Sequence, residues 1–361
     1  MTTFFSGVGV VLALELRQRV RGVAWYVLIG IFVALVAVVT FAVWFITVGF
    51  DSVDDASGAG IFSTIIYFVL LLGTLVAPAL SGNAINGDRE AGTLATTQVT
   101  LITTWQLVIG KFLAAWITAL GFLVASLPFL IFGLAIGGVG IGTIVVSTLV
   151  LALELGVVAA IGVGLSGIFA KPLFSVVVTY LVVAGLSVGT LITFALAGAA
   201  TQSTVVSTTS YGVTYSDTTG QALTCDDPET DEYTIPRFDY YWGILAANPY
   251  VVLADAAPTR FVDGYPNDLF GTIKVGVRSA QLTPNLNSVY DECDPSRSNS
   301  DGGYFAAGSD FETSEEIVEA TVPSWFVGLA VHVLMGAGAL AGAWARTNTP
   351  ARTLSAGSRI A

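Results

Sequence analysis

Six long apolar runs dominate the pattern of polar and hydrophobic positions along the chain, and each is long enough to cross a bilayer as a helix. The apolar residues are gathered into these runs rather than spaced as in an amphipathic helix or strand. Glycines at 133–142 divide the long uncharged stretch between Lys111 and Glu154 into two helices. The pattern predicts an all-α polytopic membrane protein with six transmembrane helices, at residues 25–48, 61–81, 112–136, 141–169, 173–199 and 323–345.

An amphipathic segment precedes the first run. Residues 4–21 mix apolar side chains with Glu15 and the basic residues Arg17, Arg19 and Arg21. This mixture favours an elbow helix that lies in the membrane interface, with its basic side chains toward the lipid phosphates. The first apolar run starts only after this segment and has no small-residue cleavage pattern behind it, so we expect no cleaved leader.

A polar segment, residues 83–111, separates the second run from the third and is longer than a simple connection requires. Asp88 is placed to cap a short helix over residues 89–97. Thr103 and Gln106 form a capping-box pattern, which predicts that a helix starts at Thr104 and continues into the third run. The alternative is a solvated loop with ordinary surface charges.

The composition excludes a soluble globular protein. The chain is 54% hydrophobic and only 11% charged, with a mean hydropathy of +0.77. Soluble domains carry about 25% charged residues.

The basic residues predict how the chain is oriented. If the N-terminus is inside, six crossings place nine Lys and Arg residues on the cytoplasmic face, and the short outer turns carry none. The nine are Arg17, Arg19, Arg21, Arg89, Lys111, Lys171, Arg346, Arg352 and Arg359. We therefore expect a multi-pass protein of the cell membrane, with both termini cytoplasmic and residues 200–322 extracellular.

Residues 200–322 form a long acidic insertion before the last run. The net charge of the chain is −12, and 19 of its Asp and Glu residues lie between Thr201 and Thr321 against five Lys and Arg. An acidic, lysine-poor surface stays hydrated at high ionic strength, which suggests a halophilic, haloarchaeal source; an ordinary acidic ectodomain is the alternative. The Ser/Thr-rich start suits strands or flexible loop, so we expect mixed or irregular structure.

Two features of this insertion lead to further expectations. The apolar stretch 240–254 is too short to span and is broken by Pro249, so it should lie in the outer interface or cap the bundle. The only two cysteines, Cys225 and Cys293, both lie on the oxidising side, which favours one disulfide. Two free buried thiols are the alternative.

Motifs for catalysis and nucleotide binding are nearly absent. The single Gly-Lys pair, Gly110-Lys111, lacks the first glycine and the Ser/Thr of a phosphate-binding loop, so we do not expect this chain to bind ATP by that route. One histidine and no Cys/His cluster argue against a metal site. The acidic chain lacks the basic stripe that nucleic-acid binding requires. We expect neither an enzyme nor a cofactor of its own.

Two ionisable residues, Glu154 and His332, fall inside the fourth and sixth runs. A charge at mid-bilayer costs about 3 kcal/mol on insertion scales, so each should face the bundle interior or water. The functional interpretation is a polar contact on a substrate path or a proton site. The alternative is a hydrogen bond that clamps two helices together.

The polar segment carries one specific pattern: an acidic-Arg-Glu-x-Gly-Thr-Leu run, followed by a helix with Gly-Lys. Its residues are Asp88, Arg89, Glu90, Gly92, Thr93 and Leu94 and, after a gap of fifteen, Gly110 and Lys111. This pattern resembles the signature of permease (transmembrane) subunits of type-2 ATP-binding-cassette (ABC) transporters. Two positions depart from it: Leu101 stands where the family usually has proline, and Gln106 where an acidic residue is common.

The resemblance implies a permease without its own ATPase, and an exporter, since export is the family's usual direction of transport. Two permease halves, forming a homodimer or heterodimer, would pair with two cytoplasmic ABC ATPase subunits that hold ATP and Mg. The short helix after the second span would dock on the ATPase, and the bundle would form the translocation path. Opposite charges lead us to expect a pair between Glu90 and an arginine of the elbow helix.

Three regions follow from this interpretation: residues 1–199 with the elbow, five spans and the coupling segment 83–111; the acidic loop 200–322; and the last span with its tail, 323–361. A non-transporting membrane sensor or scaffold with an acidic ectodomain is the main alternative. An intramembrane enzyme is the third, and nothing in the sequence selects a substrate.

Overall fold

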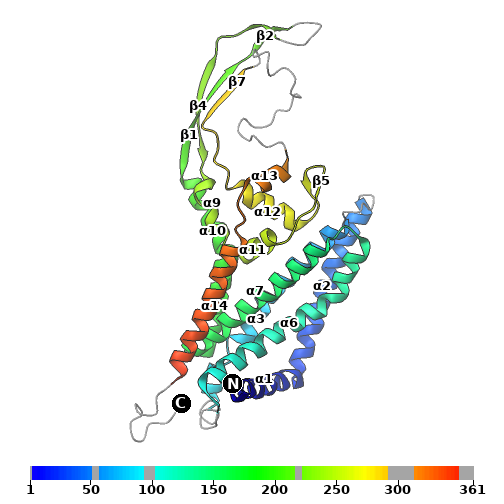
Figure 1. Ribbon diagram of the computed structural model, residues 1–361, viewed down its shortest axis with the longest axis vertical. Helices are drawn as coiled ribbons and strands as arrows, with labels where there is room; N and C mark the ends of the chain where they lie inside the picture. The colour runs from blue at the N-terminus through cyan, green and yellow to red at the C-terminus, as the bar shows by residue number, and fades with distance from the viewer. Residues whose placement is uncertain (1, 51–56, 93–101, 216–221, 292–312, 349–361) are drawn as a thin grey trace.

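The computed structural model describes residues 2–50, 57–92, 102–215, 222–291 and 313–348. A helical bundle forms the centre of an elongated molecule (Figure 1). Helix α1 (Thr2–Arg21) lies across the end of the bundle at which α14 (Trp325–Thr347) terminates. We call this the termini end. The described residues between 201 and 322 lie at the opposite end, and we call them the cap.

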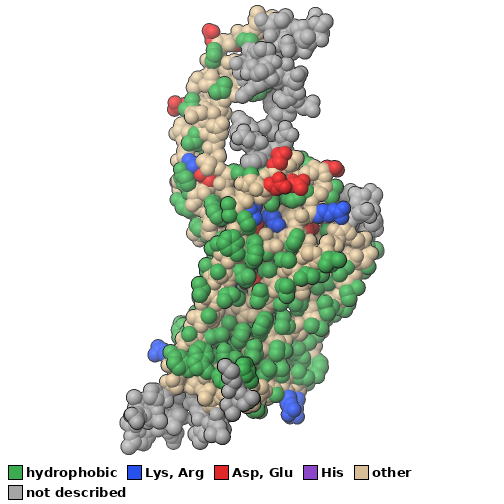
Figure 2. Space-filling view, in the orientation of Figure 1, with side chains coloured by type: hydrophobic (Ala, Val, Ile, Leu, Met, Phe, Trp, Pro, Cys, Tyr) green, Lys and Arg blue, Asp and Glu red, His purple; other side chains and the backbone are tan. Residues whose placement is uncertain are grey.

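Six of the described helices are long and apolar enough to cross a membrane, which confirms the six predicted runs. They are α2 (Val23–Phe50), α3 (Ser57–Ser81), α6 (Thr104–Ile136), α7 (Ile141–Ile168), the continuous helix α8–η1–α9 (Pro172–Ala184, Gly185–Gly189, Thr190–Ala200) and α14. Hydrophobic side chains cover the bundle face shown in Figure 2, and charged side chains gather mainly on the cap. The chain is therefore built as a polytopic membrane protein.

Small residues let α7 and α14 pack backbone against backbone. A Cβ added at Gly164 would lie 2.4 Å from the Cβ of Ala339, and one added at Gly167 would lie 2.4 Å from the Cβ of Ala343. In a membrane, such close approach is a main source of attraction between helices, because lipid is as apolar as the side chains. Helices α7 and α14 therefore form a tightly packed pair.

The fifth span contains a π-helical turn, η1, at Gly185–Gly189. A π-turn widens the helix and frees a carbonyl from the regular ladder. The buried side chain of Asn248 donates to the carbonyl of Ser187 at 2.6 Å and to Oγ1 of Thr190 at 2.9 Å. Asn248 of the cap thereby provides a hydrogen-bond donor to a backbone carbonyl of the π-turn.

The cap begins as a β-arm. Strand β1 (Gln202–Ser210) pairs antiparallel with β4 (Glu229–Pro236) and parallel with β7 (Asn287–Asp291), giving the order β4-β1-β7. Strands β2 (Gly212–Tyr215) and β3 (Ala222–Cys225) form a second, two-stranded sheet. The described part of the Ser/Thr-rich stretch, residues 202–215, is thus mainly strand, one of the two expected forms. Cys293 lies outside the described residues, so its bridge to Cys225 stays a prediction.

Short helices attach the cap to the bundle. They are η2 (Phe238–Tyr240), α10 (Trp242–Leu245), α11 (Pro249–Ala256), α12 (Leu269–Ser279) and α13 (Ser314–Ala320), with the strand pair β5 (Phe261–Val262) and β6 (Tyr265–Pro266) between α11 and α12. Val252, Leu253 and Phe270 are fully buried in the same hydrophobic core as α3, α6 and α7. The hydroxyl of Tyr67 in α3 also donates to the carbonyl of Tyr250 at 3.1 Å. The apolar stretch 240–254 therefore caps the bundle, one of the two predicted placements.

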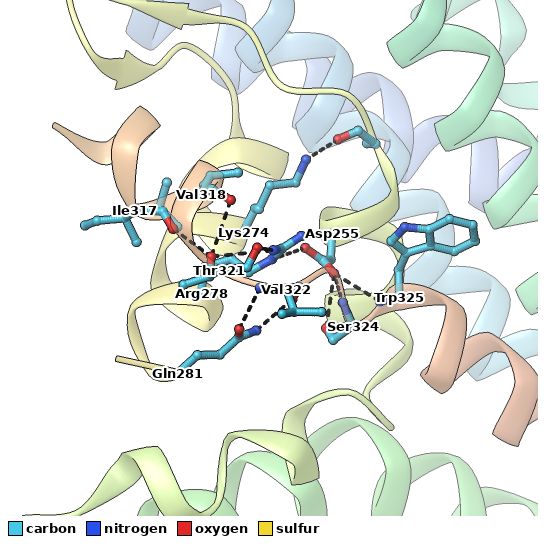
Figure 3. A network of polar contacts seen from close by, with 12 residues as sticks. Asp255, Lys274, Arg278, Gln281, Ile317, Val318, Thr321, Val322, Ser324 and Trp325 are labelled. Atoms are coloured by element: carbon cyan, nitrogen blue, oxygen red, sulfur yellow. Dashed lines mark hydrogen bonds and ion pairs between the residues drawn. The ribbon is translucent and has the colours of Figure 1, made fainter. Parts of the chain in front are cut away.

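A buried polar network joins the cap to α14 (Figure 3). Asp255 accepts from Nε of Arg278 at 2.7 Å through one oxygen. Its other oxygen accepts from the backbone N–H groups of Ser324 at 2.6 Å and Trp325 at 3.0 Å. Arg278 in turn donates to the carbonyl of Thr321 at 2.7 Å. Because a carboxylate stabilises the positive end of a helix dipole, Asp255 caps α14 from another part of the chain.

Candidate functional site

A short helix follows the second span, but it lies earlier in the chain than the predicted residues 89–97, since it ends at Glu90 and residues 91 and 92 form a turn. Helix α4 spans Asn86–Glu90 and follows a turn at residues 82–85. Asp88 lies inside this helix, so the prediction that Asp88 caps it is wrong. The part of the predicted helix from residue 93 to residue 97 lies outside the described residues.

A serine of another span takes the capping role. Oγ of Ser166 in α7 accepts from the backbone N–H groups of Ile85 at 2.8 Å and Asn86 at 3.1 Å, and donates to Oδ1 of Asn86 at 3.0 Å. These bonds satisfy N–H groups at the start of α4 that a local cap would otherwise have to serve. Helix α4 is therefore fixed to α7 at its first turn.

Gly92 follows the helix in a left-handed conformation, with φ of +72°. Its N–H donates to the carbonyl of Arg89 at 3.2 Å, which closes the last turn of α4. Glycine adopts this conformation without the strain that a Cβ would add. The left-handed turn that ends α4 thus explains the glycine at position 92. Thr93 and Leu94 lie outside the described residues.

Lys111 forms the charged centre of the site. Its side chain is only 2% exposed and forms ion pairs with Glu15 of α1 and, at 2.6 Å, with Asp88 of α4. A buried ammonium group requires such partners, since desolvation of an unpaired charge is costly. One lysine of α6 therefore joins the elbow helix and the short helix.

Gly110 allows the elbow helix to approach α6 closely. A Cβ at Gly110 would lie 2.7 Å from the Cβ of Val11 in α1. Nearby, the predicted capping box is confirmed: Thr103 Oγ1 accepts from the N–H of Gln106, and the N–H of Thr103 donates to Gln106 Oε1 at 2.7 Å. Gln106 also donates to the carbonyl of Phe4 at 3.2 Å. The α1–α6 contact is thus packed and hydrogen-bonded.

The arginines of the elbow helix do not meet Glu90. Among the described residues, no ion pair joins Glu90 to Arg17, Arg19 or Arg21. Arg19 instead donates to the carbonyl of Leu80 at 3.3 Å and to Oγ1 of Thr118 at 3.4 Å, and burial lowers its pKa. Arg17 and Arg21 are exposed. The acid that ties the elbow helix to the site is Glu15 on α1 itself, which pairs with the lysine of α6.

The outward side of α4 remains exposed to solvent. Glu90, Ala91 and Gly92 are exposed, and Arg89 is half-buried with its guanidinium 3.5 Å from the carbonyl of Gly167. The helix therefore has one side fixed to α1, α6 and α7 and another side available for contact. Helix α4 is thus linked to other helices on one side and carries exposed residues on the other.

Glu154 and His332 form a second polar site, because the structure brings the two residues together. Nδ1 of His332 lies 2.9 Å and 3.0 Å from the two carboxyl oxygens of Glu154, and both side chains are almost fully buried. Nε2 of His332 lies 2.8 Å from the carbonyl of Ala247 in the cap. The pair clamps α7, α14 and the cap together, which matches the helix-clamping alternative.

Sequence reasoning missed Glu15, Ser166 and the link between Glu154 and His332. An acid among the arginines of residues 4–21 was a usable signal for Glu15. Ser166 carries no local signal, since a serine in an apolar run is common. No metal-binding group of three or more His, Cys, Asp or Glu side chains occurs within the described ranges.

No protein-family model matches the chain, and no curated protein matches it.

Proposed function

We propose that this chain is the permease subunit of a type-2 ABC transporter, in which a separate cytoplasmic ATPase drives substrate movement through the bundle. The observation that carries the proposal is the geometry of α4. Ser166 and Lys111 connect this helix to α7 and α6, and Glu15 extends the connection to α1, while Glu90 and Gly92 remain exposed. A partner that moves α4 would therefore move three helices.

The mechanism we propose is mechanical. ATP binds to the partner with Mg, and closure of the ATPase dimer displaces α4. Helix α7 transmits the displacement to α14 through their close packing at Gly164 and Gly167. In this account the termini end is cytoplasmic and the cap is extracellular, as the basic residues predict. A bundle of six helices would pair with a second permease, identical or different, to enclose the path for export.

The Glu154–His332 pair has a positional role in this mechanism. Both side chains are buried and directed at each other, so they hold α7 and α14 in register near the cap. We assign neither residue a contact with the substrate. In this mechanism the pair keeps α7 and α14 rigid relative to each other, so that a displacement at one face of the membrane reaches the other.

A membrane sensor or scaffold is the second candidate. One observation favours it: two separate contacts join the cap to α14, one through Asp255 and the other through His332. A ligand on the cap could then act on the opposite end through α14 without any transport. The two functions differ in the partner that they require at α4.

Co-purification tests the proposal. The tagged full chain is extracted from native membranes in mild detergent, and partners are identified by mass spectrometry. We expect a soluble ATPase with Walker motifs, and we expect Glu90→Lys to reduce its yield strongly. Glu232→Lys reverses an exposed acid on β4 of the cap and serves as the matched control. Capture of a kinase, or of an ATPase equally well by wild type and Glu90→Lys, would contradict the proposal.

A further inference from the structure

A cavity lies where the loop between α6 and α7 meets the cap. Its volume is about 320 Å³, which is at the small end of the range for ligand-binding pockets. The wall includes Gly140 and Thr143 at the start of α7, Thr259 and Arg260 after α11, and Asn267 and Asp268 before α12. Its residues therefore come from the bundle and from the cap.

Asp268 supplies a negative charge at the buried wall of this cavity. Its side chain is 7% exposed, and Oδ1 accepts from the N–H of Gly271 at 2.7 Å to cap α12. The second oxygen has no hydrogen-bond or ion-pair partner in the described part of the chain. That oxygen is not fully enclosed, and Asp268 is one of the residues that line the cavity.

The charge of Asp268 lacks a direct counterion. The nearby ammonium group of Lys274 donates to the carbonyl of Ala257 at 2.6 Å and contributes only a longer-range attraction. Because the carboxylate of Asp268 is buried, its pKa is raised above the ordinary value of an aspartate. A cationic group in the cavity would compensate this desolvated carboxylate.

The rim of the cavity has the opposite sign. The guanidinium group of Arg260 is exposed. Helix α7 begins here with Gly140 as its N-cap and receives no side-chain cap, so its first N–H groups and its dipole favour an anion. The hydroxyl of Thr143 is already used, since it donates to the carbonyl of Pro258 at 2.8 Å. Negative charge inside and positive charge at the rim are therefore arranged for a ligand that carries both.

We propose that this cavity binds a small zwitterion, with its ammonium group at Asp268 and its anionic group between Arg260 and the start of α7. Asp268 and Arg260 therefore provide the two charged groups of the proposed site. An anion without a positive group would be repelled by the carboxylate of Asp268. A cation without a negative group would make no favourable contact with Arg260 or the start of α7. The same chemistry occurs in free amino acids and in the headgroup of phosphatidylethanolamine.

The test uses the full chain in nanodiscs. Glycine, β-alanine and γ-aminobutyrate serve as zwitterions of increasing length, with methylamine and acetate as half-probes, and binding is measured by calorimetry. Native mass spectrometry of nanodiscs that contain phosphatidylethanolamine or phosphatidylglycerol measures retained lipid. Asp268→Asn removes the charge and keeps the helix cap, because asparagine caps as well as aspartate does. Asp263→Asn is the matched control, since it removes an exposed acid from the neighbouring turn, where φ is +52°.

We expect at least one zwitterion to bind, or phosphatidylethanolamine to be retained in preference to phosphatidylglycerol; which of the two occurs identifies the source. Asp268→Asn should weaken that binding at least about tenfold. Arg260→Gln should weaken a zwitterion more than methylamine, and Asp263→Asn should bind as wild type does. The proposal is overturned if no zwitterion and no lipid binds, if Asp268→Asn binds unchanged, or if methylamine binds as tightly as the zwitterions.

Discussion

The two ends of the bundle both hold charged clusters, but they treat those charges differently. At the cap end, Asp255 is fully enclosed, and both its oxygens are occupied by Arg278 and by the start of α14. At the termini end, Lys111 is equally buried, yet its partner Asp88 is 37% exposed. The first cluster is closed to solvent, while the second reaches the surface.

This difference indicates different tasks. A fully desolvated ion pair is costly to open, because neither charge can regain water without disrupting the surrounding packing. A pair with one exposed partner is easier to open, because the exposed carboxylate of Asp88 can regain water while Lys111 keeps its second partner, Glu15. The cap end is therefore suited to hold its geometry, and the termini end is better able to change its contacts.

Loss of Asp255 should have the largest effect on stability. Asp255→Ala leaves Arg278 buried without its carboxylate and removes the cap of α14. Breaking a buried pair on one side costs about 3–5 kcal/mol. The free energy of unfolding of the reconstituted chain measures this cost, with the exposed Asp263→Asn as the control. An effect equal to that of the control would show that the closed network does not contribute to the free energy of unfolding.

Loss of Lys111 should cost less, although its side chain is as deeply buried. Lys111→Met keeps the apolar stem and leaves Glu15 and Asp88 facing each other. We expect a loss of about 2–3 kcal/mol, because the exposed carboxylate of Asp88 can rehydrate. Adding Glu15→Gln should recover part of the loss, measured in the same unfolding assay. A loss as large as that of Asp255→Ala would remove the distinction between the two ends.

The Glu154–His332 pair lies between the ends and tests the clamp within the bundle. Glu154→Leu leaves Nδ1 of His332 buried without a hydrogen-bond partner, which should cost about 1–2 kcal/mol. Glu154→Gln retains an oxygen that can accept from the ring and should cost clearly less in thermal unfolding of the purified chain. If both variants were equally destabilised, the carboxylate charge rather than the hydrogen bond would be what the fold requires.

Loss of the Ser166 hydroxyl should give the smallest change. Ser166→Ala removes the acceptor of two backbone N–H groups at the start of α4, which should cost about 1 kcal/mol, as for loss of a helix cap. Hydrogen exchange at Ile85 and Asn86 should rise. Ser175→Ala is the matched control, because that hydroxyl is buried but has no hydrogen-bond partner among the described residues. Exchange that rises equally in both variants would exclude a specific cap.

The spans were predictable from the sequence because bilayer thickness imposes their length and apolarity directly. The capping box at Thr103 and Gln106 was predictable for a similar reason, since all its atoms lie within one turn of chain. The stretch 240–254 was also recognisable as too short to span. Local chemistry and membrane thickness thus account for most of the correct predictions.

The remaining features depend on residues far apart in sequence. Ser166 replaces the expected cap Asp88 across about eighty residues, and Asp255 caps a helix that begins at Trp325. Glu154 and His332 were each recognised as unusual, but their pairing required the close packing of α7 against α14. No local pattern predicts such contacts, because they arise only when tertiary packing brings the helices together.

Coupled ATP hydrolysis tests most directly whether an ATPase displaces α4, as we propose. The permease and its co-purified ATPase are reconstituted, and the hydrolysis rate is compared for wild type, Glu90→Ala and Glu232→Ala at equal complex concentration. We predict that Glu90→Ala lowers permease-dependent hydrolysis severalfold while its melting temperature stays unchanged, and that Glu232→Ala has no effect. Unchanged hydrolysis in a folded Glu90→Ala variant would contradict the account.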